Sequence, residues 1–363
     1  GAVVLVAQPA LELAFGVPEV DRRRLAGQAG RLQRVVGRRE LLHVGIDIGE
    51  VGVNAEILER RDKAERRLEG QLDAADAAAV EAMRLAFNDL YMDGTVVIGE
   101  GERDEAPMLY IGEKVGNAIG TGPRIDIALD PLEGTTITAK AGPNALAVLA
   151  ISEEGGLLNA PDVYMDKLAV GPGYPDGVID LNRSAKENVE AVAAAKGVEP
   201  SDIIVCVLDR PRHERLIAEL RAIGCGIMLI PDGDVAGVIA TTDPETTIDL
   251  YMGSGGAPEG VLACAALRCV GGQFKGRLLF RNEDEKQRAR KWGITDLDKI
   301  YDLKELAKGD CIFAATGVTD GSLLDGVKRL PGGKLTTESV VMRASTGTVR
   351  WVKGEHRNNQ KPL

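Results

Sequence analysis

The chain has 363 residues, of which 44% are hydrophobic and 27% charged, a composition typical of soluble globular proteins with a sizeable core. Its formal net charge of −11 argues against binding of DNA, RNA or an anionic membrane through the overall electrostatic field. An aromatic content of 4% argues against a stacking platform for single-stranded nucleic acid.

The cysteines and histidines indicate the cellular compartment and exclude some kinds of catalytic site. The five cysteines are odd in number, form no C-x-x-C pair and lie mostly in apolar runs, so we expect buried thiols in a reducing, cytoplasmic compartment. The three histidines are far apart, which argues against a histidine-based zinc site or a Ser-His-Asp triad. Pro9 and Glu12 interrupt the apolar opening, and no run of about 18 apolar residues exists, so we expect neither a signal peptide nor a transmembrane helix.

Residues 1–72 give no regular pattern of helices or strands. Arginine is frequent there, whereas the first lysine is Lys63. We interpret this part as an N-terminal segment of uncertain fold. It is either an extension with its own structure or a sequence whose reading frame or start site differs from the rest.

A helix is predicted through residues 77–87, which are rich in alanine, the best helix former, and Asp73 and Asp76 could cap or open it. Asp76 in its first turn has two interpretations, since it would favour the helix dipole or bind a metal ion. The apolar face of this helix would consist of Val80, Met83, Leu85 and Phe87.

An acidic turn follows the apolar, strand-like run 95–98. It holds four carboxylates within six residues, among them Glu100, Glu102 and Asp104, and these repel one another unless they are solvated or neutralised by a cation. Taken alone, the turn would equally well be an exposed acidic loop.

A second acidic turn follows a predicted strand over residues 125–130. Pro131 cannot continue a ladder and Gly134 permits a tight turn, so we expect this strand to end at Asp130. Asp130 and Glu133, followed by the hydroxyl of Thr135, suit Mg²⁺ or Mn²⁺, which prefer oxygen ligands. An isolated pair at this spacing is more often a solvated turn, but two strand-to-acidic-turn junctions in succession favour a shared metal site.

The middle of the chain contains a predicted break. Residues 145–151 are predicted to form a central strand, and residues 159–165 a loop that carries Tyr164. The stretch 171–177 is rich in glycine and proline, so we place a sub-domain boundary near 165–185. The chain would then comprise a metal-binding α/β sub-domain over 73–170 and a second α/β sub-domain over 171–363.

The second half alternates predicted strands and helices, as in α/β proteins. Ligands in open α/β sheets bind outside the carboxyl ends of the strands, and polar clusters follow several strands here. The predicted strands cover residues 203–208, 226–230, 248–252, 277–280, 311–315, 339–343 and 348–352. The predicted helices cover residues 214–223, closed by Gly224, 261–270 and 283–292.

Two further clusters favour phosphate chemistry. Arg210 and Arg212 flank Pro211, which stiffens the turn, and arginine forks match phosphate oxygens. A glycine-rich loop over residues 253–256 would leave backbone N–H groups open to a phosphate at the next helix. Separately, these are as well explained by surface arginines and an ordinary loop. Together with the acidic turns they favour a phosphate-ester site that works by metal-assisted hydrolysis.

At this point the motifs resemble a known family. Residues 130–135 resemble the metal-binding signature of the lithium-sensitive sugar phosphatase superfamily. Residues 97–102, 104–110, 231–235 and 255–260 look like motifs of class II, GlpX-type fructose-bisphosphatases. The resemblance covers residues 73–355, and its motifs occur in the family's order.

The resemblance implies a fold, a reaction and a set of site residues. The fold would be a five-layer α-β-α-β-α sandwich. The reaction would be hydrolysis of the 1-phosphate of fructose 1,6-bisphosphate in gluconeogenesis, with sedoheptulose 1,7-bisphosphate also accepted by some members. The cofactor would be Mg²⁺ or Mn²⁺, and the protein would be a homo-oligomer, a dimer or a tetramer, without a nucleic-acid or membrane partner.

The resemblance also assigns roles residue by residue. The metal ligands would be Asp76, Glu100, Asp130, Glu133 and Glu259. Thr135 would orient or activate the attacking water, with Glu102 and Asp104 assisting. The sugar bisphosphate would be held by Glu133, Gly134, Thr135, Tyr164, Arg210, Pro211, Arg212, Asp232, Gly233, Asp234 and Gly256.

The sequence departs from the family just before Asp76. Family members carry a basic stretch with Gly-Asp-Lys or Gly-Glu-Lys there, whereas this chain has Gly70-Gln71-Leu72-Asp73 without a lysine. Two alternatives therefore stay open. One is another phosphatase of the superfamily, acting on inositol phosphates or nucleotide bisphosphates. The other is a sugar-phosphate binder that has lost catalysis.

Overall fold

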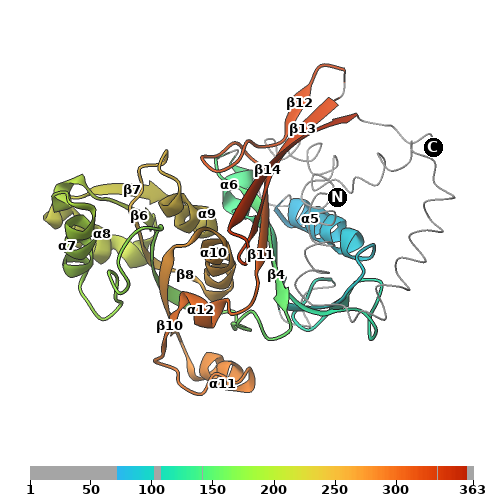
Figure 1. The fold of residues 1–363 in the computed structure, drawn as a ribbon, viewed down its shortest axis with the longest axis horizontal. Helices are drawn as coiled ribbons and strands as arrows, with labels where there is room; N and C mark the ends of the chain where they lie inside the picture. The colour runs from blue at the N-terminus through green and yellow to red at the C-terminus, as the bar shows by residue number, and fades with distance from the viewer. Residues whose placement is uncertain (1–71, 102–107, 141, 333, 358–363) are drawn as a thin grey trace.

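A computed structural model describes residues 72–101, 108–140, 142–332 and 334–357, but not the side chains of residues 72–78, 139 and 357 (Figure 1). The predicted N-terminal segment 1–72 lies outside these ranges, except for Leu72. The described residues form a mixed α/β structure with two mixed sheets, which confirms the predicted α/β class. Helices within these ranges are too short or too polar to span a lipid bilayer.

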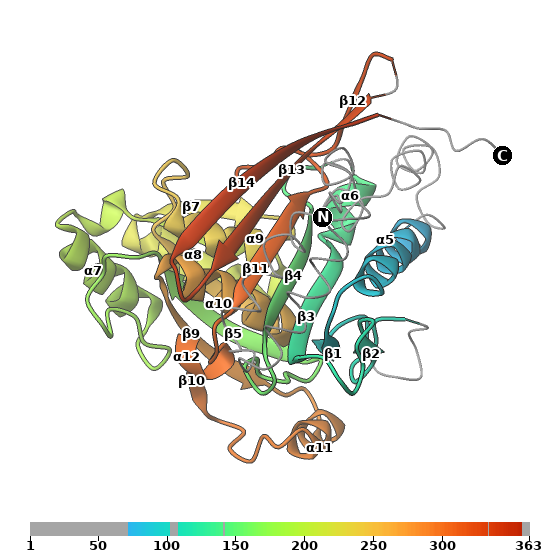
Figure 2. The same cartoon turned by 45° about the vertical axis from the view of Figure 1, so that its right-hand side comes forward.

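The first sheet draws on two distant parts of the chain. Its strand order is β12-β13-β11-β4-β3-β1-β2, with β14 paired to β13, and Figure 2 shows the strands from β14 to β2 side by side. Strands β1 and β3 are parallel, and the other pairs are antiparallel. The strands are β1 (Asp93–Ile98), β2 (Lys114–Val115), β3 (Arg124–Glu133), β4 (Leu146–Glu153), β11 (Ile312–Gly317), β12 (Lys328–Leu330), β13 (Lys334–Arg343) and β14 (Thr348–Arg357).

The second sheet brings three parallel strands together. Its order is β10-β9-β5-β8-β6-β7, and β6 is parallel to both β7 and β8, so the carboxyl ends of these three strands share one edge. The strands are β5 (Tyr164–Val170), β6 (Ile204–Leu208), β7 (Gly226–Ile230), β8 (Leu250–Gly256), β9 (Gln273–Leu279) and β10 (Ile300–Asp302).

The helices pack on both sheets. One core joins α9 and α10 to residues of both sheets, and Figure 1 shows these two helices between the sheets. A second core packs α5 on the first sheet, and a third packs α7 and α8 on the second. The α-helices are α5 (Leu72–Phe87), α6 (Thr135–Ala139), α7 (Ala185–Lys196), α8 (Glu214–Ile223), α9 (Asp234–Ile239), α10 (Ala257–Val270), α11 (Glu283–Lys291) and α12 (Leu303–Leu306). Three short 3₁₀ helices are η1 (Pro200–Asp202), η2 (Pro211–His213) and η3 (Ala240–Thr242).

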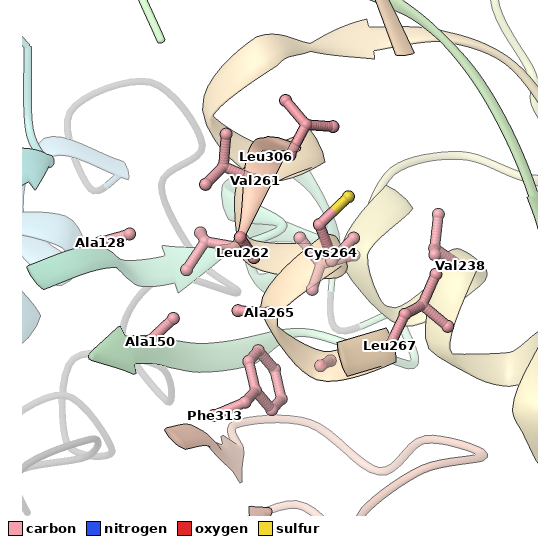
Figure 3. Close-up of a cluster of buried hydrophobic side chains, with 14 of the residues drawn as sticks. Ala128, Ala150, Val238, Val261, Leu262, Cys264, Ala265, Leu267, Leu306 and Phe313 are labelled. Atoms are coloured by element: carbon pink, nitrogen blue, oxygen red, sulfur yellow. The ribbon is translucent and has the colours of Figure 1, made fainter. Parts of the chain in front are cut away.

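Helix α10 is apolar on nearly all sides, as a helix enclosed by protein must be. Leu262 and Ala265 lie toward Ala128 of β3 and Ala150 of β4, and Leu267 lies near α9 (Figure 3). Its many alanines keep the helix slim, so the two sheets can approach it closely. This packing fixes the start of α10, which carries Glu259, against the first sheet.

Several predicted elements are confirmed. Strand β7 and helix α8 have the predicted bounds, because Gly224 ends α8 in the left-handed conformation, with φ of 88°. The predicted central strand appears as β4, which lies between β3 and β11. The predicted division into sub-domains near residue 170 stays a prediction, although each sheet crosses part of it.

Two local predictions in the first half were wrong. Leu85 is 59% exposed, because it lies about 200° around α5 from the buried Met83. Strand β3 does not end at Asp130 but continues to Glu133, since the register with β4 shifts between these two residues. A bulge of this kind accommodates Pro131, which a regular central ladder would not.

Two predictions in the second half were also wrong. Tyr164 does not lie in a loop but begins β5, where it pairs with Gly256 and Leu279. The glycine-rich residues 253–256 are strand rather than loop, because β8 pairs with β5 along its whole length. Helix α10 accordingly starts at Ala257 rather than 261. Pro258 lies in its first turn, where a backbone N–H has no partner within the helix, so the missing N–H of proline costs no hydrogen bond.

Candidate active site

Three carboxylates from two elements meet near the carboxyl end of β3. Asp130 and Glu133 lie on that strand, and Glu259 lies in the first turn of α10. One oxygen of each lies within 4.8 Å of the others, and they form the one group of potential metal ligands found among the described residues. The bulge sets this geometry, because it lets both β3 acids contribute from a single strand end.

The backbone fixes two of these acids. The Leu132 N–H donates to Asp130 Oδ1 over 2.9 Å, within the bulge. The Val235 N–H donates to Glu133 Oε1 over 3.2 Å, so the start of α9 is tied to β3. A strand of the first sheet and a helix that follows a strand of the second thus hold Glu133 from both sides.

Because these carboxylates are partly or fully buried, keeping all of them charged costs free energy unless a cation lies beside them. Loss of solvent raises the pKa of Glu133 well above its usual range, and the charges of Asp130, Asp234 and Glu259 raise it further. Loss of solvent, together with Asp234, raises the pKa of Glu259 to about 7. Glu259 Oε2 is buried and has no hydrogen-bond partner in the part of the chain that the structure describes. Hard carboxylate oxygens in this arrangement fit a divalent cation such as Mg²⁺ or Mn²⁺.

Two glycines of β8 make room for the acidic side chains. A Cβ atom at Gly256 would lie 1.9 Å from Glu259 Oε2, and one at Gly255 would lie 1.9 Å from Asp234 Oδ2. A side chain at either position would therefore force the neighbouring carboxylate to move. The sequence reasoning linked these glycines only to a phosphate.

Asp234 has a buried cationic partner that the sequence reasoning missed. Lys167 lies on β5 and is 1% exposed, and its Nζ atom is 2.5 Å from Asp234 Oδ2. The Tyr251 hydroxyl lies 3.5 Å from the same oxygen. The available signal was a lysine directly before the apolar run Leu168–Val170 of the strand, since a buried lysine requires a partner.

The arginines after β6 reach the same edge of the second sheet. Arg212 donates to the Ser254 carbonyl from Nη2 over 2.8 Å, and its guanidinium lies 4.8 Å from the centre of the Tyr164 ring. Arg281 lies over the same ring at 5.4 Å. Arg210 donates to the Pro231 carbonyl and lies 3.4 Å from Asp232 Oδ1. The structure therefore places the predicted Arg212 on Tyr164, pairs the predicted Arg210 with Asp232, and adds Arg281.

His213 supports this arrangement and was also missed. It is buried at the end of η2, where Nδ1 donates to the Leu208 carbonyl over 2.7 Å and Nε2 accepts from the Ser254 N–H over 2.8 Å. Burial lowers the pKa of His213, with the charges of Arg212 and Arg210 acting in the same direction. A neutral ring thus holds Ser254, whose carbonyl in turn accepts from Arg212. No sequence signal distinguished this histidine from the other two.

The remaining predicted residues lie as follows. Gly134 has φ of 88° and caps α6, which begins at Thr135, while Gly233 caps α9 with φ of 80°. Pro211 begins η2. Glu100 lies two residues beyond Ile98, which pairs with Ala128 of β3, but it is not a member of the close group. The side chain of Asp76 on α5 and the whole of Glu102 and Asp104 lie outside the described residues.

Comparisons with known proteins identify relatives over most of the chain. A family model described as "Bacterial fructose-1,6-bisphosphatase, glpX-encoded" matches residues 63–356. "Fructose-1,6-bisphosphatase 1 class 2" of Escherichia coli strain K12 is 46% identical over 306 residues, which cover 80% of this chain and 90% of the relative. Proteins named "Fructose-1,6-bisphosphatase class 2" from Escherichia coli O6:H1 and Shigella flexneri match with the same identity and coverage.

Proposed function

Because the chain belongs to the family of glpX-encoded bacterial fructose-1,6-bisphosphatases, we propose that it hydrolyses fructose 1,6-bisphosphate at the group formed by Asp130, Glu133 and Glu259. The protein is a phosphatase of gluconeogenesis, and the reaction releases the 1-phosphate and leaves fructose 6-phosphate. The observation that carries the location is the buried Glu259 oxygen without a hydrogen-bond partner among the described residues, beside two further carboxylates.

Divalent metal dependence follows from the family, and Mg²⁺ or Mn²⁺ is the cofactor that we propose. Asp130, Glu133 and Glu259 would hold it, with Glu100 and Asp76 as further ligands. When bound, such ions neutralise phosphate charge, lower the pKa of a water molecule and stabilise the leaving alkoxide.

The protein's own residues bind and orient the substrate. Arg212, Arg210 and Tyr164 lie at the edge where β6 and β8 end, and arginine forks there would bind phosphate oxygens bidentately. Asp232 and Asp234 would accept hydrogen bonds from sugar hydroxyls, and the Gly256 N–H would donate to the ester. Three residues fix the backbone where the helices near the site begin: Pro211 at η2, Gly233 before α9 and Gly134 before α6. Thr135, assisted by Glu102 and Asp104, would orient the attacking water.

We further propose that the helices and sheets form the five-layer α-β-α-β-α sandwich of the family. The support is that α5, the α9–α10 pair and the α7–α8 pair belong to three cores on successive faces of the two sheets. A cytoplasmic homo-oligomer, either a dimer or a tetramer, and a division into sub-domains near residue 170 complete this proposal.

The test is phosphate release by the purified full chain with Mg²⁺ or Mn²⁺ present. The wild-type protein should hydrolyse fructose 1,6-bisphosphate at a rate well above that of a folded Glu100→Ala variant. The panel includes sedoheptulose 1,7-bisphosphate, an inositol phosphate and a nucleotide bisphosphate, so that the alternative phosphatases are distinguished. Folded protein that binds fructose 1,6-bisphosphate by calorimetry but releases no phosphate would instead be a sugar-phosphate binder.

A further inference from the structure

Lys167 reaches the acidic group through a path that glycines leave open. On β5 it pairs with Gly253 of β8 and Gly276 of β9. A Cβ atom at Gly255 would lie 3.1 Å from Lys167 Nζ, and one at Gly260 would lie 3.4 Å from Cε. The side chain is thus enclosed by strand and helix backbone along its length, so its ammonium group occupies a built position.

Lys167 contacts one of four neighbouring carboxylates. Asp130, Glu133, Asp234 and Glu259 act on one another electrostatically. Among the described residues, the close group of potential metal ligands contains the first two and Glu259 but not Asp234. Asp234 is the acid that the ammonium group of Lys167 contacts, through Oδ2. An ammonium at this distance occupies that oxygen and repels a metal cation that would approach it.

The contact leaves Asp234 one oxygen for another ligand. Oδ2 receives Lys167 and lies near the Tyr251 hydroxyl, whereas Oδ1 has no hydrogen bond to another of the described residues. Asp234 begins α9 directly after Gly233, at the edge shared with Arg210 and Asp232. A charged carboxylate at this place is suited to accept a hydrogen bond from a sugar hydroxyl.

We propose that Lys167 is a positioning residue that keeps Asp234 out of the metal ligands and holds it as a charged acceptor for a sugar hydroxyl. This inference rests on the proposed function. Without Lys167, Asp234 would place an unneutralised negative charge beside Glu133 and Glu259. That charge would draw a cation toward the group, and Asp234 would turn from the sugar to the metal.

The experiment uses the full chain with Lys167→Met, which keeps an unbranched side chain, shorter by one atom, and removes its charge. Mn²⁺ binding is measured without substrate, from the free Mn²⁺ signal in electron paramagnetic resonance. KM and kcat for fructose 1,6-bisphosphate are measured separately. We expect tighter Mn²⁺ binding or an additional bound Mn²⁺, and a KM raised by about 10–100-fold, as for other residues that orient ligands, with a smaller change in kcat.

The double variant Lys167→Met/Asp234→Asn covers the case in which the single variant does not fold. It removes both charges, so no unpaired carboxylate remains. We expect it to fold, to bind Mn²⁺ as the wild type does, and to keep the raised KM because the charged acceptor is lost.

Lys196→Met is the matched control. Lys196 of α7 lies 2.5 Å from Asp249, which precedes β8 at its opposite end, so this variant also breaks a lysine–aspartate pair in the second sheet. It should leave Mn²⁺ binding and KM unchanged.

Two results would overturn the proposal. One is a folded Lys167→Met protein with wild-type Mn²⁺ binding or wild-type KM. The other is a double variant whose KM returns to the wild-type value or whose Mn²⁺ binding differs from wild type. Failure of the proposed function is recognised separately, since the wild type would then release no phosphate, whereas the Mn²⁺ comparison would still test the role of Lys167.

Discussion

Glu259 combines a buried oxygen that lacks a hydrogen-bond partner among the described residues with a pKa raised to about 7, mainly by burial. A group in this state holds a proton at mildly acidic pH, and a metal ion must displace that proton. Its chemistry therefore depends on pH in the physiological range, unlike that of a solvated glutamate.

Mn²⁺ affinity should rise with pH up to about neutrality. Below a pKa of about 7, binding releases the Glu259 proton, so the affinity should increase by about tenfold per pH unit and then level off. Calorimetric titration with Mn²⁺ between pH 5.5 and 8 measures this slope.

Glu259→Gln is the variant that tests the assignment, because it removes the proton without changing the shape of the side chain. It should bind Mn²⁺ more weakly and lose the part of the slope that the Glu259 proton contributes, while the raised pKa of Glu133 leaves a remainder. Asp176→Asn, an exposed carboxylate after β5, serves as control and should match the wild type. A slope in Glu259→Gln that equals the wild-type slope would assign the proton to another group.

The sequence reasoning found acids and missed their partners. Asp130 and Glu133 could be singled out because a second acidic cluster, after the preceding strand-like run, favours a shared metal site over a solvated turn. Lys167 and His213 could not be predicted, because their roles depend on which residues of β8 and α9 lie opposite them. That information belongs to tertiary packing and has no local pattern.

Strand β8 is the element on which the site depends most closely. Its glycines lie against Asp234 and Glu259, and its Ser254 receives Arg212 and contacts His213. Changes in this strand should therefore affect the group formed by Asp130, Glu133 and Glu259 and the position of Arg212 together.

Gly255→Ala should destabilise the protein and impair substrate binding. The new Cβ would overlap Asp234 Oδ2, and such overpacking costs about 1–3 kcal/mol. Urea unfolding and KM measure the two effects. Gly226→Ala on β7 is the control, since its nearest atom is a side-chain carbon of Ile204 at 3.1 Å, and its KM should not change. Equal KM values for the two variants would contradict the close fit at Asp234.

His213→Leu should weaken both the fold and the arginine edge. It leaves the Leu208 carbonyl and the Ser254 N–H buried without their partner, which costs about 1–3 kcal/mol. KM should rise because Ser254, the acceptor for Arg212, is released. His356→Leu on β14 is the comparison, and its KM should stay at the wild-type value. A stable His213→Leu enzyme with normal KM would show that Arg212 needs no such support.

The bounds of an element were predictable where a single residue type ends it. Gly224 ends α8, and the predicted bounds of α8 and β7 were correct. Pro131 suggested a strand end, but a bulge accommodates it within β3. The glycines of β8 suggested a loop, but they lie in a strand against the side chains of Asp234 and Glu259. In each case, contacts with another element override the local preference.

At the scale of the molecule, the group formed by Asp130, Glu133 and Glu259 joins two structural units. Asp130 and Glu133 belong to the first sheet, and Glu259 lies in the first turn of the helix that packs between both sheets. An ion bound there should act as a cross-link between them.

Mn²⁺ should therefore raise the melting temperature, and a chelator should lower it. At a free concentration of 100 times its dissociation constant, a ligand that binds only the folded state contributes about 2.7 kcal/mol. Scanning calorimetry with Mn²⁺ and with EDTA measures the difference. Glu133→Gln should remove most of the gain, while Asp176→Asn should retain it. A melting temperature that is insensitive to Mn²⁺ in the wild type would contradict a cross-link.

The α/β class could be predicted from alternating strands and helices, but the order of the strands could not. Apolar runs identify a strand without naming its neighbours. The pairing of β11 with β4 joins segments that the whole second sheet separates along the chain. Only the assembled cores reveal such a pairing.

The place of β11 between β4 and β13 has a consequence for biosynthesis. A nascent chain emerging from the ribosome carries β4 with an open edge until the segment that begins at Ile312 has left the exit tunnel. Unpaired edges of this kind invite aggregation, so this sheet closes only late in translation or after release. A premature stop codon before Ile312 would therefore yield a target for chaperones and proteases rather than a shorter enzyme.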